Sequence, residues 1–383
     1  MGSCKSTALI SLPLAPPGAA VTSNDPSKHP DTDSVGRDQS LSRRRRSSMA
    51  ATFLSRGELQ DNDDDENQRC AVDDWTQYAD LAPVLKPLAT RFCIDPGDLT
   101  TVRTLPPDGS AITTQVGNLY GEPVLVRFVD PGIGAPDAAR KAIVAEITCL
   151  AKMEHPHIVE LKGFVLSRPC GLVCVSECMA GRSLRSLLDN PRLFDRLSWT
   201  QHKLNIAIDI ASALDYMHTL KPKLIHRNVK AANVLLNRAR TVAKLSGFSA
   251  SRDRSYYQEM TNKIGDVEWS APEFLMDHED YTEKIDVYSF GVLLTELDTG
   301  SLPLVDVKDT MPSVAFTSKI VSGALRPKLS PDCPPAVAQI VKCCLQHDCH
   351  IRPSIDRVLA MLHRAKVEMG RVVVEDDNQT ASV

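Results

Sequence analysis

Several features of membrane proteins and nucleic-acid-binding proteins are missing from this 383-residue sequence. No stretch reaches the roughly 18 uninterrupted apolar residues that a transmembrane helix needs. The apolar run at residues 7–14 is too short to span a bilayer, and its weak alternative interpretation is a poor secretory signal. Because 44 Lys and Arg residues face 48 Asp and Glu residues, the net charge is −4, and bulk charge does not favour binding to nucleic acid.

The 11 cysteines lack the pattern of a disulfide framework. Their number is odd and they are scattered through a chain that is too large to need staples, so we expect reduced, intracellular thiols. One cluster groups five candidate metal ligands, namely Cys343, Cys344, His347, Cys349 and His350. We do not expect a metal site there, because no second ligand pair at zinc-finger spacing accompanies the cluster.

What the sequence does have is the composition of a globular protein, with 43% hydrophobic and 24% charged residues. Residues 1–73 are the exception. They are rich in Ser, Asp, Arg and Pro, and we expect them to form a disordered tail. Apolar residues recur regularly from Trp75 onward, and residues 366–383 are expected to be a short C-terminal tail.

The hydrophobic pattern predicts strands early in the folded part and long helices after them. Short buried strands are expected at residues 124–128 and 172–175. Helical periodicity covers residues 138–152, 201–218, 288–297 and 336–345. We therefore predict an α+β fold, in which a small β-rich lobe is joined to a larger helical lobe.

The segment from His226 to Asn233 reads H-R-N-V-K-A-A-N and resembles the catalytic loop of protein kinases, H-R-D-x-x-x-x-N. Further kinase landmarks occur in the family's order: V-L-V-R at 124–127 for V-A-I-K, Glu146 for the αC glutamate, V-S-E-C-M at 175–179 for the gatekeeper and hinge, G-F-S at 247–249 for D-F-G, A-P-E at 271–273, Asp286 for the start of αF, and Arg352 for the arginine that pairs with the A-P-E glutamate. The resemblance covers roughly residues 94–365 and implies the bilobal kinase fold. Lys230 makes the loop similar to that of tyrosine-kinase-like Ser/Thr kinases.

Two groups that phosphoryl transfer needs are replaced. Asn228 stands at the position of the catalytic aspartate, and its amide is not a base near neutral pH, whereas general-base catalysis typically contributes ~10²–10⁴-fold. Gly247 stands at the D-F-G aspartate and offers no oxygen to Mg²⁺. Asn233 remains at the second metal-ligand position, but it supplies only a neutral ligand. The resemblance therefore implies impaired Mg²⁺ binding and impaired catalysis.

The nucleotide-binding positions are also altered. Arg127 replaces the β3 lysine, so we expect a structural ion pair with Glu146, and contact with a phosphate is the alternative. Of the three glycine positions in the glycine-rich loop only Gly109 remains, because Pro107 and Ile112 occupy the other two. ATP binding is therefore expected to be weak at most.

The adenine site that the resemblance implies lies between Leu125 and Leu235, beside the hinge residues Glu177 and Met179. Leu125 takes the place of the small alanine above the adenine, and a packed site responds even to one extra methylene. We expect Leu125 to pack toward Leu235 and to fill the adenine space.

Residues that support the kinase fold are retained, in contrast to those that perform chemistry. The resemblance implies a stack of His226, Phe248 and Leu150, a buried ion pair between Glu273 and Arg352, and an Asp286 that braces the catalytic loop.

Arg227 resembles the arginine that receives an activation-loop phosphate in kinases. The segment between residues 247 and 273 carries hydroxyl groups that another kinase would phosphorylate: Ser251, Ser255, Tyr256, Tyr257 and Thr261.

Asp266 follows Gly265, where the family usually has a small hydroxyl residue. We expect Asp266 to form an ion pair with Lys230 that replaces the lost aspartate–lysine contact. The alternative is that Asp266 is a displaced catalytic base, whose carboxylate would take over the proton-accepting role that Asn228 cannot perform.

The first six residues match the myristoylation pattern M-G-x-x-x-[ST], with Gly2 as the acceptor. Cys4 is placed to take palmitate, and two lipid chains anchor a protein stably. The four arginines at 43–46 are expected to attract anionic lipid, and phosphorylation of Ser47 and Ser48 would oppose that attraction.

From the sequence we predict a membrane-anchored pseudokinase that acts as a scaffold or allosteric regulator. Its expected partner is another kinase or a signalling substrate, without nucleic acid. Its expected location is the cytoplasmic face of a membrane, with a cytoplasmic pool. The alternatives are an unorthodox active Ser/Thr kinase and a nucleotide sensor that binds without turnover.

Overall fold

The computed structural model describes residues 75–106, 111–129, 137–167, 171–253, 266–276 and 281–380, with the backbone alone for residues 372–380. The tail expected at residues 1–73 lies outside the described residues. So do Gly2, Cys4, Pro107, Gly109, and every residue proposed for phosphorylation except Ser251. The described part has the two lobes that the sequence predicts.

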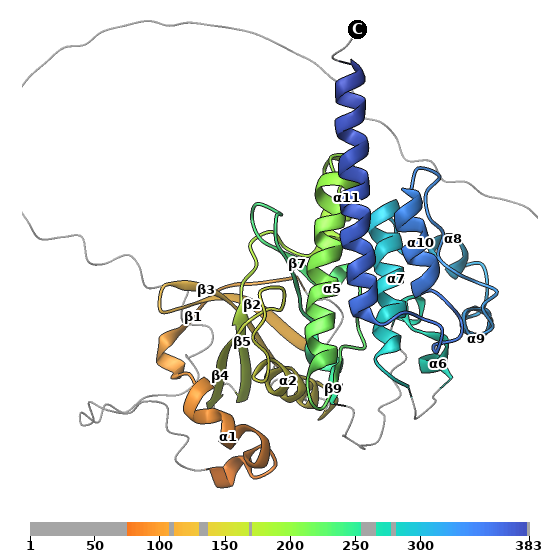
Figure 1. The fold of residues 1–383 in the computed structure, drawn as a ribbon. Helices are drawn as coiled ribbons and strands as arrows, with labels where there is room; N and C mark the ends of the chain where they lie inside the picture. Colours follow the sequence, from red (N-terminus) through yellow and green to blue (C-terminus); the bar gives the residue numbers. More distant parts are fainter. Residues whose placement is uncertain are drawn as a thin grey trace, which may run out of the picture. The chain divides into compact units, whose positions relative to one another are not determined.

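The smaller lobe, the N lobe, is built on a five-stranded antiparallel sheet in the order β1-β2-β3-β5-β4 (Figure 1). Its strands are β1 (Leu99–Thr104), β2 (Ile112–Leu119), β3 (Glu122–Val129), β4 (Leu161–Ser167) and β5 (Gly171–Glu177). Side chains alternate between the two faces of a strand. Val124, Val126 and Phe128 of β3 are buried in a cluster on one face, so Leu125 and Arg127 point to the other face.

Two helices accompany this sheet, α1 (Ala82–Phe92) and α2 (Asp137–Leu150). Helix α2 is the kinase αC helix of the sequence analysis. Its buried side chains include Ile143, Ile147 and Leu150, which recur at helical spacing and face the main core.

The larger lobe, the C lobe, is mostly helical (Figure 1). Its helices are α3 (Leu184–Leu188), α4 (Pro191–Phe194), α5 (Leu204–Thr219), α6 (Pro272–Leu275), α7 (Lys284–Thr299), α8 (Val305–Lys308), α9 (Ser313–Val321), α10 (Pro335–Cys344) and α11 (Ile355–Thr380). Two short antiparallel pairs join β6 (Leu224–Ile225) to β9 (Arg252–Asp253), and β7 (Val234–Leu236) to β8 (Ala243–Leu245).

Helix α7 is the centre of the C lobe. Each of its residues from Ile285 to Asp298 is buried, including the acidic side chains of Asp286 and Glu296. Helix α10 packs against α7, and α11 lies beside α5 (Figure 1). Among the described residues, no helix combines the length and the hydropathy needed to cross a bilayer.

The predicted fold class is confirmed, and the ends of the predicted strands and helices lie within two residues of observed ends, except at the starts of α7 and α5. Helix α7 begins four residues before the predicted 288, and α5 begins three residues after the predicted 201. There the first turn is a π-helix, Trp199–Lys203. The stretch expected to be a C-terminal tail continues α11, whose backbone is helical to Thr380.

The expectation of reduced thiols needs one correction. Cys93 is disulfide-bonded, whereas seven other cysteines among the described residues are free. The expectation rested on the number and scatter of cysteines, and these do not reveal which of them the fold brings together. Cys93 follows the last residue of α1, where the chain runs beside β4.

Candidate functional site

The kinase-like catalytic loop follows β6, and Asp286 of α7 fixes its backbone by accepting hydrogen bonds. The Asp286 carboxylate accepts hydrogen bonds from the backbone N–H groups of His226 and Arg227, both at 2.8 Å, and lies 3.0 Å from His218 Nε2. Burial alone would raise the pKa of Asp286, but the hydrogen bond and charge of His218 and the contacts to His226 lower it overall. Asp286 therefore braces the loop as an ionised group.

His226 is fully buried and makes one hydrogen bond through each ring nitrogen. Its Nε2 donates to the carbonyl of Ser246 at 3.0 Å, and its Nδ1 accepts from the backbone N–H of Asn228 at 3.2 Å. Its ring meets Phe248 edge-on, with 4.9 Å between centroids. Burial lowers the pKa of His226, which fits a neutral ring. The His226–Phe248 part of the expected stack is therefore present, and Leu150 is buried in the same core cluster as Phe248.

Asn228, at the catalytic-aspartate position, is partly buried. The hydrogen bonds described for it are made by its backbone, through its N–H to His226 and through its carbonyl to Asn233 Nδ2 at 2.7 Å. A neutral amide at this position supplies no proton acceptor for a substrate hydroxyl.

Gly247, at the D-F-G aspartate position, has a left-handed backbone with φ of 85°. A Cβ atom built on it would lie 2.6 Å from Cγ of Asn233 and 2.8 Å from that residue's Nδ2 and Oδ1. The Asn233 amide therefore occupies the space through which an aspartate side chain would leave the backbone. Asn233 Nδ2 is already used in the hydrogen bond to Asn228.

These residues do not fit the Mg²⁺ site that the kinase fold implies. The ion prefers anionic oxygen ligands in near-octahedral geometry, and Gly247 contributes none. Asn233 donates through Nδ2 to the Asn228 carbonyl, so its Oδ1 is the one candidate side-chain ligand of these two positions, and it is neutral. A single neutral oxygen does not make the Mg²⁺ site of a kinase.

Arg127 of β3 and Glu146 of α2 form the expected ion pair. Their side chains are 17% and 5% exposed, so the pair is largely shielded from water. The pair fixes α2 against the sheet, as the lysine–glutamate pair does in kinases. The positive charge of Arg127 is thus engaged in a contact within the protein.

Ile112 stands at the third glycine position of the glycine-rich loop. Its side chain is 9% exposed and belongs to the main core cluster that also contains Phe248. A buried aliphatic side chain replaces the open backbone that would approach a phosphate. Gly109, in the same loop, lies outside the described residues.

Leu125 and Leu235 lie on β3 and β7, on either side of the hinge, and both are partly buried. Leu235 packs against the main core. The filling of the adenine space by Leu125 stays a prediction. At the hinge, the Glu177 carboxylate accepts from Lys244 Nζ at 2.8 Å, and the Met179 carbonyl accepts from the backbone N–H of Arg182 at 3.2 Å.

Asp266 and Lys230 form the ion pair that the sequence suggests, with 2.5 Å between Oδ2 and Nζ. The Asp266 side chain is 41% exposed, and its backbone is left-handed, with φ of 59°. Asp and Asn are the side chains that tolerate this conformation best. The pair ties the end of the activation segment to the catalytic loop.

Further contacts that the sequence did not reveal hold the same segment. Trp269 Nε1 donates to Glu296 Oε2 of α7 at 2.7 Å, and the Trp269 carbonyl accepts from Ser289 Oγ at 2.7 Å. Glu296, fully buried, also accepts from the backbone N–H of Ala231 at 2.9 Å. Lys308 of α8 pairs with the largely buried Glu268.

Glu273 and Arg352 make the expected buried ion pair. The two guanidinium nitrogens NH1 and NH2 donate to the two carboxylate oxygens at 2.5 and 2.7 Å. Arg352 is 1% exposed and also donates to three backbone carbonyls, of Gln346, His347 and Lys284. Such a bidentate, fully satisfied pair fixes geometry as well as charge.

One expectation about phosphate recognition meets contrary geometry, and the phosphate-receiving role expected of Arg227 stays a prediction. Ser251 is 2% exposed, and its hydroxyl donates to the His226 carbonyl, so it is not accessible to a kinase in this arrangement. The guanidinium of Arg227 lies 5.2 and 5.5 Å from the ring centroids of Phe274 and Tyr281. These rings stabilise the cation.

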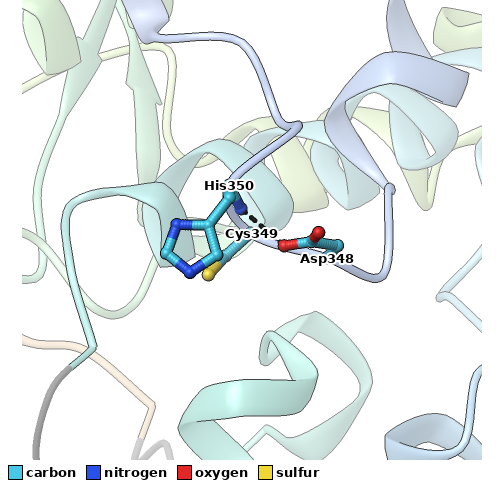
Figure 2. A group of neighbouring side chains, drawn as sticks. All are labelled: Asp348, Cys349 and His350. Atoms are coloured by element: carbon cyan, nitrogen blue, oxygen red, sulfur yellow. Dashed lines mark hydrogen bonds between the residues drawn. The ribbon is translucent and has the colours of Figure 1, made fainter.

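The Cys and His cluster near the C-terminal end divides into separate parts. Asp348, Cys349 and His350 bring potential ligand atoms within 4.8 Å of one another (Figure 2). However, Asp348 accepts a hydrogen bond from the backbone N–H of His350 at 2.8 Å, as in an ordinary turn. Cys344 is buried in the core, and His347 Nδ1 faces Arg326 at 3.2 Å.

Comparison with known proteins agrees with this geometry. The family model of protein tyrosine and serine/threonine kinases matches residues 111–362. A probable serine/threonine-protein kinase of Dictyostelium discoideum is 35% identical over 218 residues, which are 57% of this chain and 22% of that protein. The serine/threonine-protein kinase STY46 of Arabidopsis thaliana is 30% identical over 230 residues, 60% of this chain and 38% of that protein.

The probable serine/threonine-protein kinase SIS8 of Arabidopsis thaliana is 32% identical over 252 residues, 65% of this chain and 23% of that protein. The chain thus spans well under half the length of each of these relatives. With its two lobes, its catalytic-loop architecture and its family match in agreement, this chain belongs to the protein tyrosine and serine/threonine kinase family.

Proposed function

We propose that this protein is a pseudokinase of the tyrosine-kinase-like group, and that it acts by binding as a scaffold or allosteric regulator of another kinase or of a signalling substrate. The observation that carries the proposal is Gly247, whose missing side chain leaves no metal carboxylate and whose Cβ space is taken by the Asn233 amide. The neutral Asn228 at the catalytic position removes the second anionic group. Neither loss is compensated by a described carboxylate free of a partner beside these two positions.

The retained contacts support a binding role. The Arg127–Glu146 pair, the Asp286 brace and the Glu273–Arg352 pair all maintain the shape of a kinase domain. Holding these polar groups in place is unfavourable in entropy, and without a metal site it contributes nothing to phosphoryl transfer. A shaped surface is what a scaffold or an allosteric regulator presents to its partner.

A second candidate function is phosphotransfer by an unorthodox mechanism. It is favoured by Asp266, a partly exposed carboxylate beside Lys230 of the catalytic loop. In that mechanism Asp266 would accept the proton of the substrate hydroxyl, and ATP would be held by Arg127. A third candidate, a nucleotide sensor, needs only that ATP binds without metal.

The test is a thermal-shift titration of the full chain with ATP, with and without Mg²⁺. A ligand at 100 times its Kd stabilises a protein by ~2.7 kcal/mol, which is a readily visible shift. The pseudokinase proposal expects no Mg²⁺-dependent shift at millimolar ATP. A shift that is independent of Mg²⁺ supports the sensor, and a shift that requires Mg²⁺ contradicts the proposal and favours the unorthodox kinase.

We also propose that Gly2 is myristoylated and Cys4 palmitoylated, which would place the protein on the cytoplasmic face of a membrane with a cytoplasmic pool. The sequence pattern at residues 1–6 supports this proposal. Gly2→Ala is expected to move the protein from the membrane fraction to the soluble fraction. An unchanged partition of the Gly2→Ala variant would refute the lipid anchor.

A further inference from the structure

Residues 75–94 precede the family match, which begins at residue 111, yet they are packed into the N lobe. Leu85 of α1 is 0% exposed and Leu81 is 6% exposed. Both belong to the main core cluster, and α1 is in contact with α2 and with β4. Because these leucines are removed from water, the segment is packed on the N lobe and is not a loose tail.

An ion pair adds a directional contact between the same two elements. Arg140 of α2 reaches both carboxylate oxygens of Asp80, at 2.9 and 3.2 Å. Asp80 lies just before α1. The two side chains are 40% and 60% exposed, so the pair sets the register of α1 on α2 more than it adds stability.

The other end of the segment is joined to β4. The backbone N–H of Ile94 donates to the Phe164 carbonyl at 2.9 Å. A Cβ atom on Gly163 would lie 2.4 Å from the Phe92 carbonyl oxygen, so the close approach depends on glycine at that position. The segment thus bridges an edge strand of the sheet and helix α2.

Helix α2 carries Glu146, the partner of Arg127. Ile143 and Ile147 are four residues apart and share one face, and Glu146 lies within the same turn. Because α1 contacts α2 and Asp80 is paired with Arg140, the segment holds the helix that carries Glu146. We propose that residues 75–94 are an intramolecular clamp on α2, which keeps Glu146 paired with Arg127 in the absence of nucleotide. This inference does not depend on whether the cleft transfers phosphate.

The test is hydrogen exchange of the full chain, with Leu85→Ala as the variant and Leu204→Ala as its matched control. Both leucines are fully buried in the same cluster, but Leu204 lies on α5 of the C lobe. Leu85→Ala is expected to speed amide exchange in α2 about tenfold or more, while α7 is unchanged. Leu204→Ala is expected to speed amide exchange in α2 no more than in the rest of the chain.

Two results would overturn the clamp. One is unchanged exchange of α2 in Leu85→Ala. The other is an equal rise of exchange in α2 and α7, which would mean that Leu85 supports only global stability.

A charge swap tests the clamp without opening a cavity, because Asp80 and Arg140 are both exposed. Asp80→Arg alone is expected to speed α2 exchange about two- to fivefold. Combining it with Arg140→Asp is expected to restore the wild-type rate. Failure of the double variant to restore protection, or no effect of the single variant, would contradict the ionic part of the proposal.

The link to the Arg127 pair is tested by a double-mutant cycle. In Glu146→Gln the pair is already broken, so Leu85→Ala should add less α2 exchange than it does in the wild type. Full additivity of the two changes would show that α1 stabilises α2 without acting on the Arg127–Glu146 contact.

Discussion

Single residues decide whether the cleft can hold a metal. Aspartate is not merely missing at residue 247, because the Asn233 amide lies where the aspartate Cβ would sit. Asn233 is held there by its hydrogen bond to the Asn228 carbonyl. A carboxylate at residue 247 would therefore also require Asn233 to move, and one substitution is not expected to create a metal site.

Gly247→Asp is expected to gain no Mg²⁺-dependent ATP binding and to lose about 1–3 kcal/mol of stability, because its Cβ must displace Asn233. Gly247→Ala is the control, since it adds the Cβ without the charge, at a backbone that alanine adopts poorly. Thermal shift with ATP and Mg²⁺ measures both variants. A Mg²⁺-dependent shift gained by Gly247→Asp alone would contradict this description of the site.

His226 gives a prediction for pH. Burial lowers its pKa in the folded state below the ordinary 6.5, so the unfolded chain binds the proton first as the pH falls. Its Nδ1 accepts from the Asn228 N–H, and a proton there would replace an attraction with a repulsion. The contribution of His226 to stability is thus present above about pH 6.5 and declines as the pH falls below it.

The measurement is urea unfolding of the wild type and His226→Phe between pH 7.5 and pH 5. Phe keeps the ring against Phe248 but does not titrate. The variant is expected to be less stable at pH 7.5, because two hydrogen bonds are lost, and to show a smaller decline toward pH 5. An equal decline in both proteins would mean that His226 is not the titrating group.

At the scale of elements, ion pairs join segments that are distant in the sequence. Arg352, in the loop before α11, binds Glu273 of α6. The arginine is also hydrogen-bonded to three backbone carbonyls, so its removal leaves several buried acceptors without a donor.

Arg352→Ala is expected to lower the free energy of unfolding by about 3–5 kcal/mol, because it leaves a shielded carboxylate unpaired. Lys162→Ala, which removes an exposed pair with Glu160, is the control and should cost less than about 1 kcal/mol. Arg352→Lys should recover little, because lysine cannot make the bidentate contact. Equal stability of Arg352→Ala and Lys162→Ala in urea would disprove the structural role.

The sequence foretold contacts whose two partners both stand in kinase motifs. The Arg127–Glu146 and Glu273–Arg352 pairs are of this kind, and so is the pair between Lys230 and Asp266. Motif order fixes which elements meet, because the family fold fixes their places. No motif includes α1, an 11-residue helix that contains Pro87. Its contact with α2 could therefore not be predicted from the order of motifs.

Other misses have the same origin. The burial of Ser251 against the His226 carbonyl depends on packing between distant segments, which residue type does not encode. The motif also could not reveal that the Asn233 amide lies where a Cβ of residue 247 would stand, because a glycine in the motif shows only that the side chain is missing. The neighbouring Ser246 gives no signal for this position either, because its hydroxyl donates to the backbone carbonyl of Asn233 and does not contact the side-chain amide.

At the scale of the whole molecule, the two lobes are held in the arrangement of a kinase, while the groups that would use it are replaced. The N-lobe sheet is fixed to α2 by the Arg127–Glu146 pair, and the activation segment is tied to the C lobe by Lys230, Glu296 and Arg352. Such a molecule presents a stable surface without needing nucleotide to form it.

The central claim is that this surface works without phosphotransfer. The most direct measurement is incorporation of phosphate from Mg²⁺–ATP by the full chain, into itself and into a general protein substrate, beside the Asp266→Asn and Arg127→Ala variants. The account predicts incorporation no greater than background and no difference among the three proteins. Incorporation by the wild type that Asp266→Asn or Arg127→Ala abolishes would contradict the account and establish an active kinase.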